Sequence, residues 1–466
     1  MKNFFKRKKV LIMGLGSYKD GSGIASAEFF AKAGDDVLVT DLRSESELSH
    51  QVKRLKKYKN VTYVLGEHRE EDFRKCDIVI KNPSVPKDSK YLKIAEDNKI
   101  PIHNDWSIFL TKKDNLLLAV TGTRGKSTTT TIINELLKDN FRTHLCGNIG
   151  VSPLAIISKV NKGDIIVAEL SSWLLYNFRS VKKSPNISVI TNLMPDHLNK
   201  YKNLEDYYDD KKNIFRYQKS DDILILNKDN KESKKLAKEA KSKIYWFSKK
   251  PLLKRDRGVF LKNDEIFFQE DGITHSIANI KKIKEKGEHN KENFLAALSV
   301  AYLLGIKKAD IQKTINEFKG VENRLEFLRE FCGVKFYNDT TATSPDAAIV
   351  ALNTLGSSRK NIILLAGGAD KKLEYEVFAK SIKKYTKGVI LFSGDATDKI
   401  EKELKNIKYN NFIKTTSSMN DAVKIAIENS KRGDIILLSP GAASFGIFKN
   451  EFDRGDKFCA IVKRLK

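Results

Sequence analysis

Residues 119–131 read AVTGTRGKSTTTT and continue the apolar run that begins at Leu116. Glycines let backbone N–H groups approach phosphate oxygens, a lysine neutralises their charge, and a hydroxyl reaches a magnesium ion at a helix N-terminus. Here only two residues separate Gly122 from Gly125, whereas the usual phosphate loop has four. The stretch predicts a shortened phosphate loop between a buried strand and a helix. Taken alone, it is also compatible with a plain strand-to-helix turn.

The residues that follow this loop alternate between apolar strands and amphipathic helices. Three apolar runs end in polar residues: GDIIVAELSS (163–172), ISVITNLMPDH (187–197) and DDILILNKD (221–229). Short strands alternating with helices are typical of a parallel sheet built from βαβ units. Because ligands of such sheets bind beyond the carboxyl ends of the strands, we expect the polar residues at those ends to line a site.

The flanking parts of the chain show the same alternation. Before the loop stand KVLIMGLG (9–16), DVLVTD (36–41) and CDIVIKNPSVP (76–86), and after it stand NIILLAGGADKK (361–372) and GDIILLSPGAAS (433–444). We therefore predict an α/β protein with three domains at residues 1–112, 113–321 and 322–466. The first and third are expected to be Rossmann-like, and the central one to be a parallel-sheet domain like those of P-loop ATPases.

Composition fits a multidomain globular enzyme. The chain has 466 residues, of which 41% are hydrophobic and 31% charged, and a length near 150 residues per domain favours about three domains. No apolar run approaches the roughly 18 to 20 residues that cross a bilayer, so membrane insertion is not expected. The four cysteines are far apart, without paired spacing, which indicates neither a zinc site nor a disulfide framework and favours the reducing cytoplasm.

The net charge of +26 raises the question of nucleic acid binding. The basic residues are spread along the chain and interleaved with acids, as in KKIKEKGEHNKE (281–292). This pattern favours a solvated, lysine-rich surface, and no nucleic acid partner is expected.

The phosphate loop TGTRGKS resembles the T-G-[ST]-x-G-K-[ST] loop of the Mur ligase family, ATP-dependent enzymes that add amino acids to the UDP-MurNAc peptide precursor of peptidoglycan. Further family motifs occur in the family's order along nearly the whole chain. They are CGNIG (146–150), AELSSWLL (168–175), NLMPDHLNKY (192–201), YYDDKKNIF (207–215), GEHNKENFLAA (287–297), NRLEF (323–327), YNDTTATSPDA (337–347) and LSPGAASFGIFKNEFDRG (438–455).

Within the family, VLIMGLG together with VTDLRS most resembles the ligases that add D-glutamate to UDP-MurNAc-L-Ala, and the D-N-P-R motif of the ligases adding diaminopimelate or lysine is absent. The resemblance implies the substrates ATP, UDP-MurNAc-L-Ala and D-glutamate, an acyl-phosphate intermediate, two Mg²⁺ sites and a monomeric cytoplasmic enzyme of cell wall biogenesis.

The resemblance also implies roles for individual residues in ATP use. Lys126, His197 and Lys211 are the implied catalytic residues, and Lys211 is expected to be carbamylated, although Lys212 lies beside it. The implied metal ligands are Ser127, Glu169, His197 and Lys211 as its carbamate. The residues implied to bind ATP are Gly122, Thr123, Arg124, Gly125, Lys126, Ser127, Thr128, Asn290, Asn293, Arg324 and Asp339.

The two other substrates are assigned in the same way. The residues implied to bind the UDP-linked substrate are Ser17, Tyr18, Asp41, Arg43, Asn82 and Asn148, and those implied to bind the amino acid are Thr343, Lys371, Ser444 and Phe445. In GLGSYK, Lys19 stands where a dinucleotide fingerprint has its third glycine, and Gly21 and Gly23 follow after an insertion. Helix capping and interdomain ion pairs remain alternative explanations for the asparagines and for Arg324 and Asp339.

Three positions depart from the family pattern. Thr341 replaces a lysine, Asn323 replaces a histidine and Arg124 precedes the second loop glycine. These departures leave open whether the amino acid is D- or L-glutamate. Other functions weighed are a folylpolyglutamate synthase, a Rossmann oxidoreductase and a P-loop translocase on nucleic acid, and each fits the motifs less well.

Overall fold

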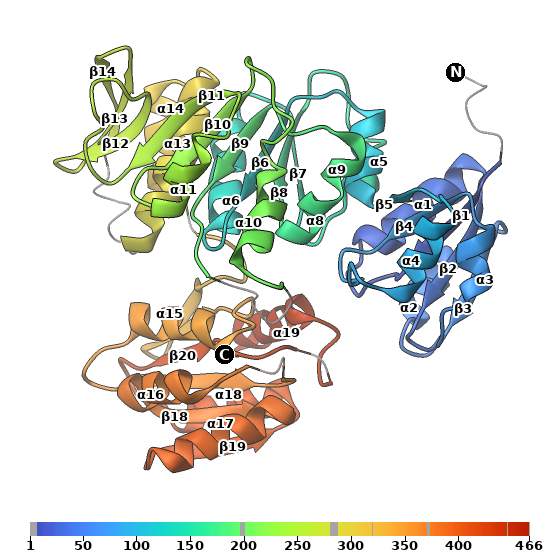
Figure 1. The fold of residues 1–466 in the computed structure, drawn as a ribbon. Helices are drawn as coiled ribbons and strands as arrows, with labels where there is room; N and C mark the ends of the chain where they lie inside the picture. The colour runs from blue at the N-terminus through green and yellow to red at the C-terminus, as the bar shows by residue number, and fades with distance from the viewer. Residues whose placement is uncertain are drawn as a thin grey trace. The chain divides into compact units, whose positions relative to one another are not determined.

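The computed structural model describes residues 7–195, 201–279, 288–318, 320–370, 373–444 and 446–465. Packing divides the chain into two compact units, residues 1–318 and 319–466 (Figure 1). Unit 1 holds two sheets and unit 2 holds one. Within the described ranges, no helix combines the length and apolar character that crossing a bilayer requires.

The N-terminal sheet has five parallel strands in the order β3-β2-β1-β4-β5. Its elements are β1 (Lys9–Met13), α1 (Ser22–Ala33), β2 (Asp36–Asp41), α2 (Ser49–Leu55), β3 (Val61–Leu65), α3 (Glu70–Lys75), β4 (Ile78–Lys81), α4 (Lys90–Asp97), β5 (Ile102–His103) and α5 (Asp105–Lys112). The order reverses at β1, so the loops after β1 and β4 meet at the switch point where such sheets bind ligands. The predicted first strand is confirmed.

The central sheet has nine strands in the order β14-β13-β12-β11-β10-β9-β6-β8-β7. Its strands are β6 (Leu117–Thr121), β7 (Thr143–Gly147), β8 (Ile165–Glu169), β9 (Ile187–Ile190), β10 (Ile223–Asn227), β11 (Lys243–Ser248), β12 (Gly258–Lys262), β13 (Glu265–Glu270) and β14 (Ile273–Asn279). Its helices are α6 (Lys126–Leu137), α7 (Pro153–Ile156), α8 (Ser172–Tyr176), α9 (Phe178–Val181), α10 (Leu204–Lys212), α11 (Lys231–Leu236), α13 (Glu288–Leu303) and α14 (Lys308–Glu317). The seven strands β6 to β12 are parallel. Beyond β12 the strands β13 and β14 add two antiparallel pairings, and this extension was not part of the sequence prediction.

The third sheet has six strands in the order β15-β16-β20-β17-β18-β19, with only β15 antiparallel. Its elements are β15 (Glu326–Phe331), β16 (Val334–Asn338), α15 (Pro345–Leu355), β17 (Ile362–Gly367), α16 (Glu376–Tyr385), β18 (Thr386–Phe392), α17 (Asp395–Asn406), β19 (Phe412–Thr416), α18 (Met419–Glu428), β20 (Ile435–Leu438) and α19 (Glu451–Arg464). The expected α/β class therefore holds for all three sheets.

The first two sheets share one compact unit because α5 packs into both parts. Its Trp106 is buried and packs its ring against Phe109 and against Phe178 of α9. The Asp105 carboxylate of α5 accepts a 2.7 Å hydrogen bond from the Ser152 hydroxyl, which precedes α7. The division at residues 112 and 113 remains a prediction. The structure adds that α5 packs against α1 on one side and against α7 and α9 on the other.

The N-terminal glycine loop, from Gly14 to Tyr18, packs closely against the start of α1 at Gly23. A Cβ at Gly23 would lie 2.1 Å from the Gly14 carbonyl oxygen and 2.6 Å from the Leu15 Cα, so only glycine permits this approach of helix to loop. Gly23 therefore has the packing role that the sequence could not assign after the insertion beyond Lys19.

We predict that Gly23→Ala destabilises unit 1 by about 1–3 kcal/mol, the usual range for forcing atoms into a packed site, because the new methyl group meets backbone rather than a side chain. Gly21→Ala is the matched control: Gly21 precedes the same helix with φ −74, a conformation open to alanine, and its added Cβ would come no nearer than 3.1 Å to a neighbouring atom, the Tyr18 Cβ. Thermal denaturation followed by circular dichroism would compare the two. Equal losses at both positions would contradict the packing explanation.

Candidate active site

The phosphate loop joins β6 to α6, and its two glycines are imposed by close contacts. Gly122 has φ +149, and a Cβ there would lie 1.9 Å from the Thr191 hydroxyl oxygen. Gly125 has φ +81, and its Cβ would lie 2.2 Å from the Asn293 Oδ1. Both the backbone conformation and the available space therefore require glycine.

The end of β9 braces this loop from the neighbouring strand. The Thr123 N–H donates to the Asn192 carbonyl (2.9 Å), and the Arg124 N–H donates to the Asn192 Oδ1 (2.9 Å). The Thr191 hydroxyl donates to the Arg124 carbonyl (2.6 Å). Sequence reasoning missed Thr191 and Asn192, although their position directly after an apolar strand was a usable signal.

Two lysines donate to the carbonyls of the loop. The Lys126 ammonium donates to the carbonyls of Gly122 (3.1 Å) and Thr123 (3.0 Å), and the Lys211 ammonium donates to the Gly122 carbonyl (2.9 Å). Lys211 is only 2% exposed, whereas Lys212 points outward and pairs with Glu239 at 2.7 Å. The structure thus separates the two adjacent lysines, which sequence alone left open.

Helix α13 lies against the start of α6 through its asparagines. The Thr129 hydroxyl donates to the Asn293 Oδ1 (3.3 Å), and the Asn293 amide donates to the Asn290 Oδ1 (3.2 Å). Ser127 and Thr128 lie in the first turn of α6. The implied nucleotide residues of the two helices are therefore brought together at one end of the sheet.

Glu169 ends β8 and pairs in register with Val120, two residues before the loop. It is 1% exposed, and its Oε1 accepts a 3.0 Å hydrogen bond from the Asn148 side-chain amide. The other carboxylate oxygen, Oε2, is buried and has no hydrogen-bond partner among the described residues. An oxygen left in this state next to a phosphate loop suits a hard divalent cation.

Three of the expected site residues, His197, Lys371 and Phe445, lie outside the described residues. In the part of the chain that is described, no three His, Cys, Asp or Glu residues cluster as metal ligands would.

The N-terminal glycine loop is held by Asp41 at the end of β2. The Asp41 carboxylate accepts the Leu15 N–H (2.9 Å) and the Arg43 guanidinium (2.7 and 3.0 Å). Burial alone would raise the pKa of Asp41, but these hydrogen bonds outweigh burial and hold its pKa below the usual value. Asn82 packs on the other side, with its amide nitrogen 3.0 Å from where a Cβ on Gly16 would lie. Ser17 and Tyr18 lie half-buried in the same loop.

In unit 2, Asp339 follows β16 and is buried. It accepts hydrogen bonds from the Ser439 hydroxyl (2.7 Å) and the Leu325 N–H (3.0 Å). Burial raises the pKa of Asp339 to about 6, and the hydrogen bond from Ser439 and the charge of Arg324 only partly oppose this shift. Arg324 itself is exposed in the turn before β15.

Two of the departures from the family pattern contact each other in this turn. The Thr341 hydroxyl donates to the Asn323 carbonyl (2.8 Å), and Asn323 adopts the left-handed conformation, with φ +63. Asparagine tolerates this conformation better than most residues. The pair therefore fixes the turn that carries Arg324.

The last part of the site surrounds Ser444. Its hydroxyl oxygen is buried and without a hydrogen-bond partner in the described structure. Gly368, Ser393 and Arg454 line the same small pocket. Arg454 is fully buried and donates to the Thr340 carbonyl (2.9 Å); it stands in the last family motif of the sequence, which assigned it no role. The Thr343 N–H donates to the Thr341 carbonyl (2.9 Å).

Comparison with known proteins identifies this arrangement. Family models match residues 8–104 (Mur ligase MurD-like, N-terminal domain), 120–301 (Mur ligase middle domain) and 323–441 (Mur ligase, glutamate ligase domain). A UDP-N-acetylmuramoylalanine–D-glutamate ligase of Roseiflexus sp. is 37% identical over 466 residues, covering 98% of both chains. The chain belongs to the Mur ligase family.

Other members agree along the whole length. A UDP-N-acetylmuramoylalanine–D-glutamate ligase of Thermoanaerobacter pseudethanolicus is 37% identical over 99% of both chains. Among solved structures, the Mur ligase MurC of Thermotoga maritima matches 99% of this chain and 100% of its own with a TM-score of 0.61 at 20% identity. The MurF ligase of Thermotoga maritima in complex with ADP matches 100% of both chains with a TM-score of 0.55 at 17% identity. These two structures establish the Mur ligase fold.

We predict that the raised pKa of Asp339 makes unit 2 less stable as pH rises. Between about pH 4 and 6 the folded protein keeps a proton that the unfolded chain has lost, so the free energy of unfolding falls, by up to about 3 kcal/mol for this shift. Urea denaturation of wild type and Asp339→Asn across pH 4–7 would measure it. The wild-type value minus that of the variant should fall between pH 4 and 6, and a constant or rising difference would contradict the assignment.

Proposed function

We propose that this chain is an ATP-dependent, ADP-forming ligase that adds D-glutamate to UDP-N-acetylmuramoyl-L-alanine in peptidoglycan precursor synthesis. The observation that carries the proposal is the full-length identity to ligases of that name, together with an N-terminal part that matches the MurD-like model. The phosphate loop and its two lysines supply the matching chemistry.

The reaction needs ATP because a carboxylate oxygen is a poor leaving group. A carboxylate oxygen of the alanyl group attacks the γ-phosphorus of ATP, ADP leaves, and an acyl phosphate forms. The amine nitrogen of D-glutamate then attacks the acyl carbon, loses a proton and expels inorganic phosphate, which leaves an amide. Catalysis of such steps consists mainly of positioning and of charge neutralisation.

The phosphate loop provides both the positioning and the charge neutralisation. Backbone N–H groups at the start of α6 face the nucleotide phosphates, and Lys126 neutralises their charge. Lys126 already reaches the loop carbonyls of Gly122 and Thr123, so turning its ammonium toward a phosphate oxygen exchanges those acceptors for a stronger one. Asn290 and Asn293 border the loop from α13, and they are proposed to lie beside the nucleoside of ATP.

A divalent cation fits the same end of the sheet. The buried Oε2 of Glu169, without a hydrogen-bond partner in the described part of the chain, and the Ser127 hydroxyl would hold Mg²⁺. Asn148 would orient Glu169 through its other oxygen. His197 and Lys211 as its carbamate would supply the second proposed site. When bound, Mg²⁺ neutralises phosphate charge and orients the phosphoryl group.

The other two substrates are assigned to the loops at the remaining sheets. The loop from Gly14 to Tyr18, with Asp41, Arg43 and Asn82, is proposed to bind the uridine diphosphate, since Asp41 is kept ionised and fixed by Arg43. Thr343, Lys371, Ser444 and Phe445 are proposed to bind D-glutamate, and Arg324 and Asp339 to contact the nucleotide from the third domain. We also propose a monomeric enzyme in the cytoplasm, where the four free cysteines stay reduced.

We predict phosphate release that requires ATP, Mg²⁺, UDP-MurNAc-L-Ala and D-glutamate together, with a product heavier by one glutamyl residue. Parallel reactions would omit each component, add EDTA, or offer L-glutamate instead. Dependence on L-glutamate would keep the mechanism and move the chain to a sister ligase, which Thr341 and Asn323 leave open. No release with either amino acid would overturn the proposed function.

We predict that Lys211→Ala lowers kcat by roughly 100-fold or more, since a group that positions the reacting phosphate has this order of effect. Lys212→Ala is the control: it removes the adjacent lysine, whose ammonium pairs with Glu239 at 2.7 Å instead of reaching the phosphate loop. Steady-state phosphate release and a melting curve would be recorded for both variants. Loss of activity in the Lys212 variant alone would contradict the assignment of Lys211.

A further inference from the structure

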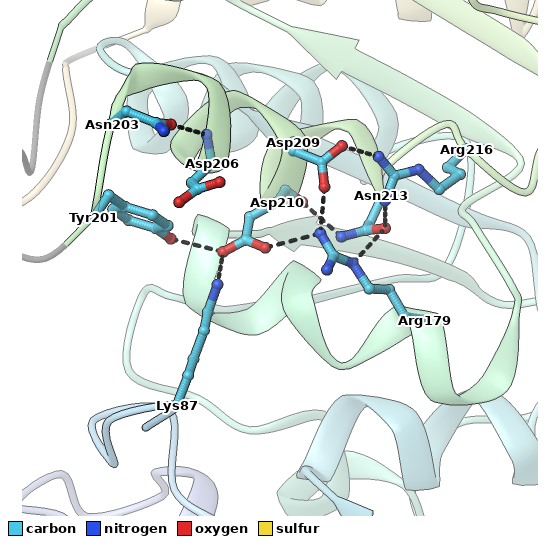
Figure 2. Close-up of polar contacts among 9 residues, drawn as sticks. All are labelled: Lys87, Arg179, Tyr201, Asn203, Asp206, Asp209, Asp210, Asn213 and Arg216. Atoms are coloured by element: carbon cyan, nitrogen blue, oxygen red, sulfur yellow. Dashed lines mark hydrogen bonds and ion pairs between the residues drawn. The ribbon is translucent and has the colours of Figure 1, made fainter. Parts of the chain in front are cut away.

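Asp210, the residue before Lys211, is a buried carboxylate at the centre of a polar cluster. Only 2% of its side chain is exposed. Its Oδ2 accepts hydrogen bonds from the Lys87 ammonium and the Tyr201 hydroxyl (3.0 Å), and its Oδ1 accepts one from the Arg179 guanidinium (3.1 Å), as Figure 2 shows. A buried carboxylate is tolerated only when it is paired and hydrogen-bonded in this way.

The three donors come from different parts of unit 1. Arg179 belongs to α9, and Tyr201 precedes α10, so both are carried by the central sheet. Lys87 follows β4 of the N-terminal sheet, five residues after Asn82, which packs against the glycine loop. Asp210 therefore connects the segment beside the glycine loop to the helix that carries Lys211.

The contacts of Lys87 are specific. Its ammonium lies 4.1 Å from the centre of the Tyr176 ring and 5.0 Å from that of the Tyr201 ring, in addition to its ion pair with Asp210. Cations over tyrosine faces are attracted electrostatically, more so when partly desolvated. The Tyr201 ring is itself stacked on Trp173, with centroids 4.9 Å apart.

Successive helix residues point about 100° apart, so Asp210 and Lys211 face different partners. Asp210 faces Lys87, Arg179 and Tyr201 (Figure 2), whereas the Lys211 ammonium reaches the Gly122 carbonyl at 2.9 Å. One turn earlier, Tyr207 packs its ring 4.7 Å from the Lys211 ammonium. The contacts of Asp210 thus fix the rotation of α10 that aims Lys211 at the phosphate loop.

We infer that Asp210 is a positioning residue for Lys211, and that the Lys87–Asp210 ion pair couples acceptor binding at the N-terminal glycine loop to nucleotide binding at the phosphate loop. The coupling part rests on the proposed function. Binding that orders the segment from Asn82 to Lys87 strengthens the hold on Asp210, and by reciprocity nucleotide binding favours the same arrangement.

The test measures the affinity of the full chain for the β,γ-imido analogue of ATP with Mg²⁺ by calorimetry, with and without UDP-MurNAc-L-Ala. Without acceptor, Asp210→Asn should weaken analogue binding by roughly tenfold, the order of effect of a misplaced positioning group. Lys87→Met should leave that affinity nearly unchanged but abolish its response to the acceptor, and Lys87→Arg should restore the response. In the double variant the losses should not add, as expected for partners of one pair.

Two matched controls separate positioning from a general loss of charge. Asp206→Asn removes an exposed carboxylate one turn earlier on α10, and Lys90→Met removes an exposed lysine three residues after Lys87. Both should behave as wild type. Melting curves show which variants fold, and Lys87→Met keeps Arg179 and Tyr201 on Asp210, so one informative variant retains most of the cluster.

Wild-type affinity without acceptor in Asp210→Asn would overturn the positioning role. A full acceptor response in Lys87→Met, or no response in wild type that turns over the acceptor, would overturn the coupling. Absence of any glutamate-dependent turnover in wild type would instead overturn the proposed function, and with it the coupling to this acceptor. The measurements made without UDP-MurNAc-L-Ala would still decide the role of Asp210.

Discussion

The carbonyl of Gly122 is the point on which the central site depends. Two lysines, Lys126 from α6 and Lys211 from α10, donate to it, and the Thr191 hydroxyl lies so close to Gly122 that no side chain would fit there. Because the shortened loop has only two residues between its glycines, its shape is set by contacts with β9 and not by its own length. The loop after β6, the end of β9 and the helices α6 and α10 therefore meet around this carbonyl.

The charged groups of this protein differ in effect according to how deeply they are buried, and their total number matters less. The net charge of +26 is carried largely by exposed lysines, and most of their ion pairs are surface pairs that contribute little to stability. The buried groups behave differently. Asp41, Asp210 and Asp339 each have defined donors, and the balance between burial and those donors lowers the pKa of Asp41 and raises that of Asp339. The Oε2 of Glu169, which has no hydrogen-bond partner among the described residues, is an exception that a cation would resolve.

The departures from the family pattern have a local structural reason. Asn323 and Thr341 share a hydrogen bond, and the turn they form directs Leu325 N–H onto Asp339. A lysine in place of Thr341 would add a cationic group near the turn that carries the exposed Arg324, and a histidine in place of Asn323 would add an ionisable one. The pair therefore alters the charge at the edge of unit 2 while the turn keeps its form.

The sequence by itself determined the α/β class, the phosphate loop and the order of the family motifs, because apolar runs, glycines and a helix start are local features. It placed Lys126 in the loop and Glu169 at a strand end for the same reason, whereas Asp41 was assigned through the family resemblance; the roles of all three stay predictions. Family spacing favoured Lys211, but the residues themselves did not distinguish it from Lys212, because helix rotation is set by the contacts of Asp210. Nor could the sequence assign Gly23, because its need for glycine arises from backbone 9 residues earlier at Gly14. Thr191, Asn192 and Arg454 were missed since their partners lie in loops that follow other strands, far away in the sequence. Those relations exist only once strands distant in sequence lie side by side, and that is what the tertiary structure decided.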